Sequence, residues 1–177
     1  MKVAVTGHTK GIGLSLFEYF QQDGNTCLGF SRTNGYNISD KDNRTKIVEE
    51  SSNCDIFVNN AYSNFDDSQL YLLQSIYNKW AGQDKLIINI SSRITDWPVD
   101  LNEGPAAYYE TKTRQDQFCA GKRSFPQILN LRVGITDTQR VQHFSRNKMN
   151  PADIIDAVKF AITSKNKFRV TSMTFGL

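Results

Sequence analysis

The stretch Thr6-Gly7-His8-Thr9-Lys10-Gly11-Ile12-Gly13 follows directly on residues 1–5, an apolar run of strand length. Its three glycines let the backbone turn sharply, approach a pyrophosphate closely and pack the next helix against the strand. Apolar residues at helical spacing follow from Ile12 to Phe20, and the positive end of that helix would face the phosphates. The stretch therefore predicts a nucleotide-binding strand–turn–helix, and the alternative is an ordinary strand-to-helix turn.

The composition is that of a single soluble domain. The chain has 177 residues, of which 39% are hydrophobic and 22% charged. A net charge of +3, with no basic cluster interleaved with aromatic residues, argues against nucleic-acid binding. No apolar run has membrane-spanning length, and residues 1–3 lead directly into a strand, so we expect no membrane segment, no signal peptide and a cytoplasmic location.

The cysteines predict neither a metal site nor a disulfide framework. Cys27, Cys54 and Cys119 are odd in number and lack metal-binding or CxxC spacing. We therefore expect buried or free thiols in a reducing compartment, and no metal.

Strand-length apolar runs alternate with helical patterns along the whole chain. This alternation predicts an α/β fold, a doubly wound parallel sheet of the Rossmann type, in one domain over residues 1–177. Its ligand should lie outside the carboxyl ends of the strands. The expected strands lie near 2–6, 26–31, 54–60, 85–91, 127–133 and 168–175, and the expected helices near 12–22, 40–51, 67–80, 106–123 and 151–163.

Polar residues at successive predicted strand ends indicate a site. Tyr108 and Lys112 are four positions apart in a predicted helix and share one face. A cation beside a phenol stabilises the phenolate, so such a tyrosine can exchange a proton with a carbonyl or alcohol oxygen. Ser92 ends a buried strand and could hold a substrate oxygen, while Asn59 and Asn60 end another. Taken singly, each serine or asparagine is better explained as a cap or a turn, and the spacing of Tyr108 and Lys112 could equally arise by chance.

In this order the elements resemble the short-chain dehydrogenase/reductase family. The resemblance implies hydride transfer between a nicotinamide cofactor and a small carbonyl or alcohol substrate. The matching elements are the glycine pattern at 6–13, Asn59-Asn60-Ala61, Ser91-Ser92, Tyr108 with Lys112, residues 132–138 and residues 150–155.

The resemblance also implies a role for each matching residue. Tyr108 would be the catalytic acid/base, Lys112 would stabilise its phenolate and bind the nicotinamide ribose, and Ser92 would hold the substrate carbonyl. The expected cofactor-binding residues are Gly7, Thr9, Lys10, Gly11, Ile12, Gly13, Ser31, Arg32, Thr33, Asn37, Asn60, Ala61, Tyr108, Lys112, Gly134, Thr136 and Thr138.

The end of the second strand favours NADP(H) over NAD(H). An acid there would bind the ribose 2′-hydroxyl and repel a 2′-phosphate. The chain instead has Arg32, which suits bidentate phosphate binding, and Lys10 in the glycine turn offers a second cation. The alternative is that Arg32 only stacks on adenine and Lys10 is solvated, which leaves NAD(H) open.

Departures from the family pattern bear on turnover. Tyr62 replaces the glycine of the Asn-Asn-Ala-Gly element, and residues 96–100 are interpreted as a small inserted loop. The family's catalytic helix asparagine has no clear counterpart, with Gln69 and Asn64 as candidates. Two functions therefore stay open: an oxidoreductase for a carbonyl/alcohol pair that favours NADP(H), or a dinucleotide-binding sensor or regulatory protein with little turnover.

The helix near 67–80 carries more apolar side chains than one face needs. We expect some of them to cover the sheet and the remainder to form the seam of a homodimer. These residues are Leu70, Leu72, Leu73, Ile76, Tyr77 and Trp80.

Overall fold

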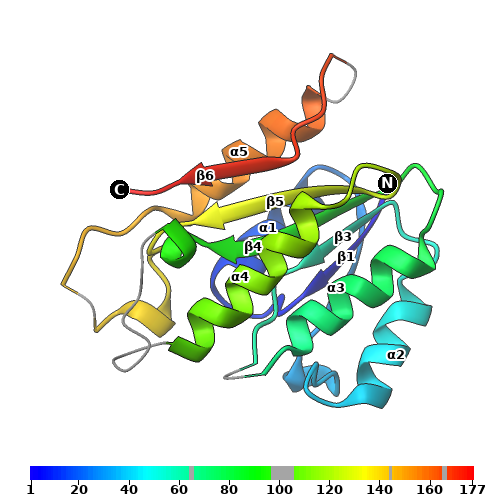
Figure 1. Cartoon of the computed structure of the whole chain (residues 1–177), viewed down its shortest axis with the longest axis horizontal. Coiled ribbons are helices and arrows are strands. Elements are labelled where there is room, and N and C mark those ends of the chain that lie inside the picture. Colours follow the sequence, from blue (N-terminus) through cyan, green and yellow to red (C-terminus); the bar gives the residue numbers. More distant parts are fainter. Residues whose placement is uncertain (64–65, 97–105, 144, 165–166) are drawn as a thin grey trace.

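The fold is built on a parallel sheet, seen in a computed structural model that describes residues 1–63, 66–96, 106–143, 145–164 and 167–177 (Figure 1). Six strands lie in the order β2-β1-β3-β4-β5-β6, and every neighbouring pair is parallel. They are β1 (Lys2–Thr6), β2 (Thr26–Phe30), β3 (Ile56–Asn59), β4 (Leu86–Ser92), β5 (Gln127–Val133) and β6 (Ser172–Phe175).

Helices cover both faces of the sheet. α1 and α5 pack together on one face, while α2, α3 and α4 lie side by side on the other (Figure 1). The described residues form α1 (Gly11–Gln22), α2 (Lys41–Glu50), α3 (Ser68–Lys79), α4 (Ala106–Ala120) and α5 (Pro151–Thr163).

The strand order reverses beside β1, which is where a doubly wound sheet has its ligand-binding crevice. The chain leaves β1 toward β2 on one side and returns to β3 on the other. At such a reversal the loops that follow the two strands diverge, and ligands bind outside the carboxyl ends. The glycine turn follows β1 and Asn60 follows β3, so the two polar elements flank this crevice.

Two apolar clusters, one on each face, hold the sheet between the helices. Val5 and Val58 pack with α1 and α5, whereas their strand neighbours Ala4 and Phe57 pack with α2, α3 and α4. Because successive strand residues point to opposite faces, strands covered on both sides must be apolar throughout. This requirement explains the continuous apolar runs of β3 and β4.

The predicted elements are confirmed, with shifts at their ends. The largest difference is β6, which begins at Ser172 rather than near 168. Three short 3-10 helices were not predicted from the sequence: η1 (Arg32–Asn34), η2 (Arg93–Asp96) and η3 (Gln139–Val141). In η1, the side chains of Ser31 and Asn34 each hydrogen-bond the backbone of the other residue. Because such a turn has no hydrophobic periodicity, the apolar pattern of the sequence did not predict it.

The six apolar side chains on which the dimer seam was predicted are all used inside the molecule. Leu70, Leu72, Leu73, Ile76, Tyr77 and Trp80 are each buried in the chain's own core. The surplus on which the dimer seam was predicted is therefore absent from the surface of α3, and that argument for a homodimer was wrong. Within the described ranges, no helix is long and apolar enough to cross a bilayer.

All three cysteines are free thiols, as expected. Cys54 and Cys119 are buried, and Cys27 is partly exposed. Burial raises the pKa of the Cys119 thiol to about 12, an effect that the Asp116 carboxylate reinforces and Lys112 opposes. A raised pKa keeps a thiol protonated, and only the thiolate reacts with alkylating reagents.

We predict that iodoacetamide labels Cys119 about a thousandfold more slowly in the native protein than in urea at about pH 9, because few native thiols are ionised there. The native rate should rise about tenfold per pH unit until the pH approaches 12. Peptide mass spectrometry would follow each cysteine separately. Equal labelling rates in native and unfolded protein would show that Cys119 is not buried as described.

Candidate active site

The glycine turn needs glycine for two different reasons. Gly7 has φ of 69°, and a Cβ there would stand 2.9 Å from Asn60 Nδ2. A Cβ on Gly13 would stand 2.2 Å from the Gly7 carbonyl oxygen, so α1 packs directly on the turn. In this described segment, Lys10 makes no capping bond and the first turn of α1 contains no acid. The positive end of α1 is therefore open to an anion.

Thr6 joins the two loops that flank the crevice. Its Oγ1 accepts hydrogen bonds from the backbone N–H groups of Asn60 and Ala61, each at 3.0 Å. In return, Asn60 Nδ2 donates to the Thr6 carbonyl at 3.0 Å. The Asn60 amide thus supports the glycine turn.

The turn after β2 presents one cation and uses its own hydroxyl groups internally. Ser31 Oγ lies 2.7 Å from Thr33 Oγ1 and 3.0 Å from Asn34 Oδ1. The Arg32 guanidinium is exposed and forms no hydrogen bond or ion pair with the described residues. Asn37 is exposed and accepts from the Ser39 backbone at 3.2 Å. Ser31 and Thr33 therefore shape the turn, while Arg32 is available to a ligand.

The segment after β5 reaches the glycine turn through Thr138. A Cβ on Gly11 would stand 3.0 Å from Thr138 Cγ2, which places this residue at the start of α1. Thr136 is buried, and its hydroxyl donates to the Gly134 carbonyl at 3.1 Å. Gly134 donates its N–H to Phe175 at 3.0 Å, so it serves the contact with β6. Of these three predicted cofactor residues, Thr138 is the one brought to the turn.

The remaining predicted residues of the turn lie just before α1 or in its first turn. Thr9 and Lys10 are exposed, and Ile12 is half-buried against the core. The exposed Lys10 side chain can therefore bind a phosphate group of a ligand. Among the described residues, no group of three or more His, Cys, Asp or Glu side chains is arranged to hold a metal ion.

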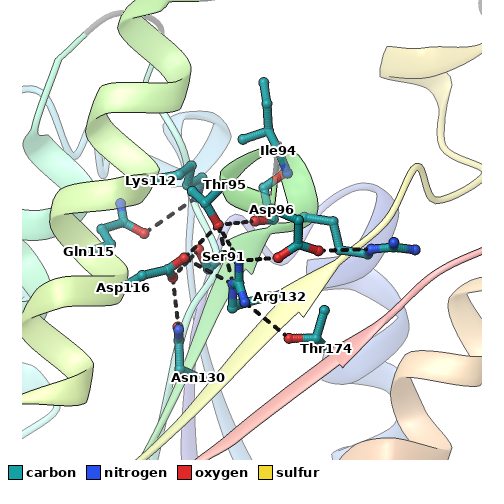
Figure 2. A network of polar contacts seen from close by, with 12 residues as sticks. Ser91, Ile94, Thr95, Asp96, Lys112, Gln115, Asp116, Asn130, Arg132 and Thr174 are labelled. Atoms are coloured by element: carbon teal, nitrogen blue, oxygen red, sulfur yellow. Dashed lines mark hydrogen bonds and ion pairs between the residues drawn. The ribbon is translucent and has the colours of Figure 1, made fainter. Parts of the chain in front are cut away.

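Lys112 is a buried ammonium group on the inner face of α4. Only 3% of the residue is exposed. Its Nζ donates to Gln69 Oε1 at 2.8 Å, to the Ile90 carbonyl at 3.0 Å and to Gln115 Oε1 at 3.4 Å. A buried charge is tolerated when hydrogen bonds replace its water. These amide oxygens, of which Figure 2 shows that of Gln115, hold the lysine beside β4, at a carbonyl two residues before Ser92.

Tyr108 lies one turn before Lys112 and shares its surroundings with Tyr62. The Lys112 Nζ lies 5.6 Å from the centre of the Tyr108 ring and 5.3 Å from that of Tyr62. The two rings meet edge to face, with centroids 5.0 Å apart. Tyr62 therefore packs against both residues at the position where the family pattern has glycine. The presence of a tyrosine in place of glycine at position 62 was the sequence signal for this contact, but the sequence did not show in which direction the Tyr62 ring points.

Of the two candidates for the family's helix asparagine, Gln69 contacts the lysine. It is fully buried, and its Nε2 donates to the carbonyls of Asn59 at 2.9 Å and Ile90 at 3.1 Å. With its oxygen on Lys112, the one amide joins α3, β3, β4 and α4. The other candidate, Asn64, lies outside the described residues, as does most of the proposed insertion at 96–100.

Ser92 ends β4 and begins the turn that forms η2. It is half-buried, and its Oγ accepts from the Ile94 N–H at 3.2 Å. Neighbouring Ser91 donates to Asp116 Oδ1 at 2.6 Å. Gln115 and Asp116 were not predicted, although their spacings of three and four from Lys112 place them on its helix face.

Comparison with known proteins bears on the fold. No family profile and no curated protein matches the sequence. A 3-ketoacyl-(acyl-carrier-protein) reductase from Brucella melitensis, solved with NADH, is similar with a TM-score of 0.79 and 17% identity over 98% of this chain and 95% of that one. A 3-alpha-hydroxysteroid dehydrogenase from a Pseudomonas species, solved with NADH, gives a TM-score of 0.77 and 17% identity over 99% and 94%.

A third solved structure binds the other nicotinamide cofactor. A short chain dehydrogenase from Burkholderia cenocepacia in complex with NADP has a TM-score of 0.79 at 13% identity, over 99% of this chain and 88% of that one. Such likeness extends over nearly the whole chain while the identity stays low. The chain therefore has the fold of the short-chain dehydrogenases and reductases.

Proposed function

We propose that the protein is a nicotinamide-dependent oxidoreductase that interconverts a carbonyl and an alcohol and favours NADP(H). The observation that carries this proposal is the burial of Lys112 beside Tyr108, at the carboxyl edge of the sheet that also holds the glycine turn. Burying an ammonium group costs free energy, and a lysine needed only for stability would be replaced by an apolar residue at little loss. A cation fixed next to a phenol suits proton transfer.

The residues present fit a dinucleotide. The glycine turn has no side chain where a pyrophosphate would approach, α1 leaves its positive end open, and Thr138 stands beside Gly11. When bound, the nicotinamide would supply or accept the hydride. The structures of similar fold include proteins solved with NADH and with NADP, so they favour neither cofactor. The preference for NADP(H) rests on Arg32 and Lys10.

In the proposed reduction, each residue of the site has a separate task. The Ser92 hydroxyl would donate a hydrogen bond to the substrate carbonyl oxygen and hold it in place. As hydride reaches the carbonyl carbon, Tyr108 would give its phenolic proton to that oxygen, which leaves an alcohol and a phenolate. Lys112 would stabilise the phenolate until a proton returns from solvent. Oxidation of the alcohol would follow the same steps in reverse.

Tyr108→Phe should lower kcat by about 10²- to 10⁴-fold, the usual contribution of a general acid, because it removes only the phenolic proton. Affinity for NADPH should stay within about twofold, since the ring remains. NADPH oxidation against a panel of aldehydes and ketones, together with fluorescence titration, would measure both quantities. The neighbouring Tyr109→Phe is the matched control and should leave kcat unchanged. An active Tyr108→Phe enzyme would reject the proposed acid.

Arg32→Ala should weaken NADPH binding by about tenfold or more, because a charge-assisted hydrogen bond to the 2′-phosphate is worth about 1.5–3 kcal/mol. Affinity for NADH, which lacks that phosphate, should not change. Arg123→Ala removes the same charge from the loop before β5, at the opposite edge of the sheet, and serves as control. If wild-type protein bound NADH more tightly, and Arg32→Ala left NADPH binding intact, the preference would be refuted.

Gln69→Leu should destabilise the fold by about 1–3 kcal/mol, because it removes one acceptor of a buried ammonium and the side-chain donor to a strand carbonyl. The same change should reduce kcat, since Lys112 would no longer be held beside Tyr108. Urea unfolding and NADPH oxidation would follow the two effects. Gln74→Leu, on the same helix but without a hydrogen bond to the site, should affect neither. An unchanged kcat would show that Gln69 is not needed for the reaction.

One observation favours the alternative of a dinucleotide-binding sensor with little turnover. Lys112 has three protons to donate, and three amide oxygens lie within hydrogen-bonding distance of its Nζ. To bind a ribose hydroxyl, the lysine would exchange one of these partners, and Gln115 at 3.4 Å holds it least closely. Tight NADPH binding with no oxidation on a broad panel would support the sensor.

A homodimer stays a prediction that light scattering at micromolar concentrations would test.

A further inference from the structure

We infer that Asp116 is a positioning residue that fixes the turn carrying Ser92 against the Tyr108–Lys112 face of α4. Tyr108, Lys112 and Asp116 follow one another at intervals of four and therefore line one face of the helix. Ser92 belongs to a different element, the end of β4. The two halves of the proposed site thus need a link that sets their spacing, and Asp116 lies where α4 meets β4, β5 and η2 (Figure 2).

The carboxylate of Asp116 is fully occupied by donors from three elements. Its Oδ1 accepts from Ser91 Oγ at 2.6 Å and Asn130 Nδ2 at 2.8 Å. Its Oδ2 accepts from Thr95 Oγ1 at 2.8 Å and Arg132 Nε at 3.1 Å. A carboxylate offers about four lone-pair directions, so these donors saturate it. Such a group has one favourable orientation and transmits it to β4, η2 and β5 together.

Thr95 carries this constraint to Ser92. Its hydroxyl donates to Asp116, accepts from Arg132 Nη2 at 2.7 Å, and lies 3.1 Å from the Ser92 carbonyl oxygen. One residue earlier, the Ile94 N–H donates to Ser92 Oγ. The turn therefore contacts Ser92 at two atoms, its Oγ and its carbonyl oxygen. Arg132 also pairs with Asp96, which keeps the far end of η2 on β5.

A buried row of amides fixes α4 at a second point. Asn59, Asn89 and Asn130 stand in register on β3, β4 and β5, each at most 3% exposed. Asn59 Nδ2 donates to Asn89 Oδ1 at 2.9 Å, and Asn89 Nδ2 donates to Asn130 Oδ1 at 2.8 Å. Asn130 then donates to Asp116. Asn59 is bonded to Gln69, so the row ends at Lys112 on one side and at Asp116 on the other.

The two ends of the amide row lie one helical turn apart on α4. Rotation or sliding of that helix would break bonds at both ends, so Tyr108 and Lys112 are held in one position relative to the strands. A small displacement of a reacting group costs much in rate, about 10²-fold for 1 Å. Loss of Asp116 should therefore reduce kcat more than it changes cofactor affinity. This catalytic consequence rests on the proposed function, but the clamp itself does not.

The experiment compares Asp116→Asn, Thr95→Val and Thr95→Ser with wild type and with Glu110→Gln. The last variant makes the same carboxylate-to-amide change on the exposed side of α4. Hydrogen exchange at the Ile94 and Thr95 amides reports on the turn without any need for turnover. Asp116→Asn and Thr95→Val should speed this exchange by about tenfold or more, whereas Thr95→Ser, which keeps the hydroxyl, and Glu110→Gln should not.

The kinetic readout separates positioning from general loss of structure. Asp116→Asn and Thr95→Val should lower kcat by about 100-fold with NADPH affinity within about twofold of wild type, and Thr95→Ser should restore kcat. Unchanged exchange in Asp116→Asn and Thr95→Val would overturn the clamp. Faster exchange with wild-type kcat would overturn the positioning role. A wild-type protein without turnover would refute the proposed function, while the exchange rates would still decide on the clamp.

Discussion

The burial of the Lys112 ammonium is the constraint on which the site depends. A charge removed from water must be surrounded by acceptors, and here α3, α4 and β4 each provide one. Gln69 has to be buried with its oxygen toward the lysine, and its nitrogen then needs the carbonyls of β3 and β4. The positions of two helices and two strands thus follow from one side chain. Apolar contacts could hold these elements together, but they have no preferred direction.

The polar groups inside the sheet have a directional order that the apolar core lacks. Three asparagines at one register of β3, β4 and β5 pass hydrogen bonds across the sheet and end on Asp116. Buried amides are costly unless each finds its partner, and the Asn59 Oδ1 is left without one. These amides lie at the end of β3 and within β4 and β5, and through Asp116 they fix the orientation of α4 beside the carboxyl edge of the strands. The same edge holds the glycine turn and Ser92, where orientation matters for chemistry.

The proposed cofactor side and the proposed substrate side of the crevice are built differently. On the proposed cofactor side, hydrogen bonds between Thr6 and Asn60 join the loops after β1 and β3, and Arg32 is exposed. On the proposed substrate side, charged groups are paired: Asp116 and Asp96 both neutralise Arg132, and Arg93 pairs with Asp96. Exposed cations suit a mobile anionic ligand, whereas paired charges suit a rigid frame. The division agrees with the roles proposed for the two regions.

The sequence by itself determined the sheet, the α-helices and the glycine turn around which the site is proposed. Apolar periodicity marked the strands and α-helices of the described residues, and glycine spacing marked the turn at Gly7, because these signals are local and repeat along the chain. Tertiary structure alone decided which polar residues meet: Gln69 and Gln115 at Lys112, Tyr62 on Tyr108, and Asp116 with Arg132. Such contacts join residues far apart in sequence, and the direction of a hydrogen bond is fixed only when the elements pack.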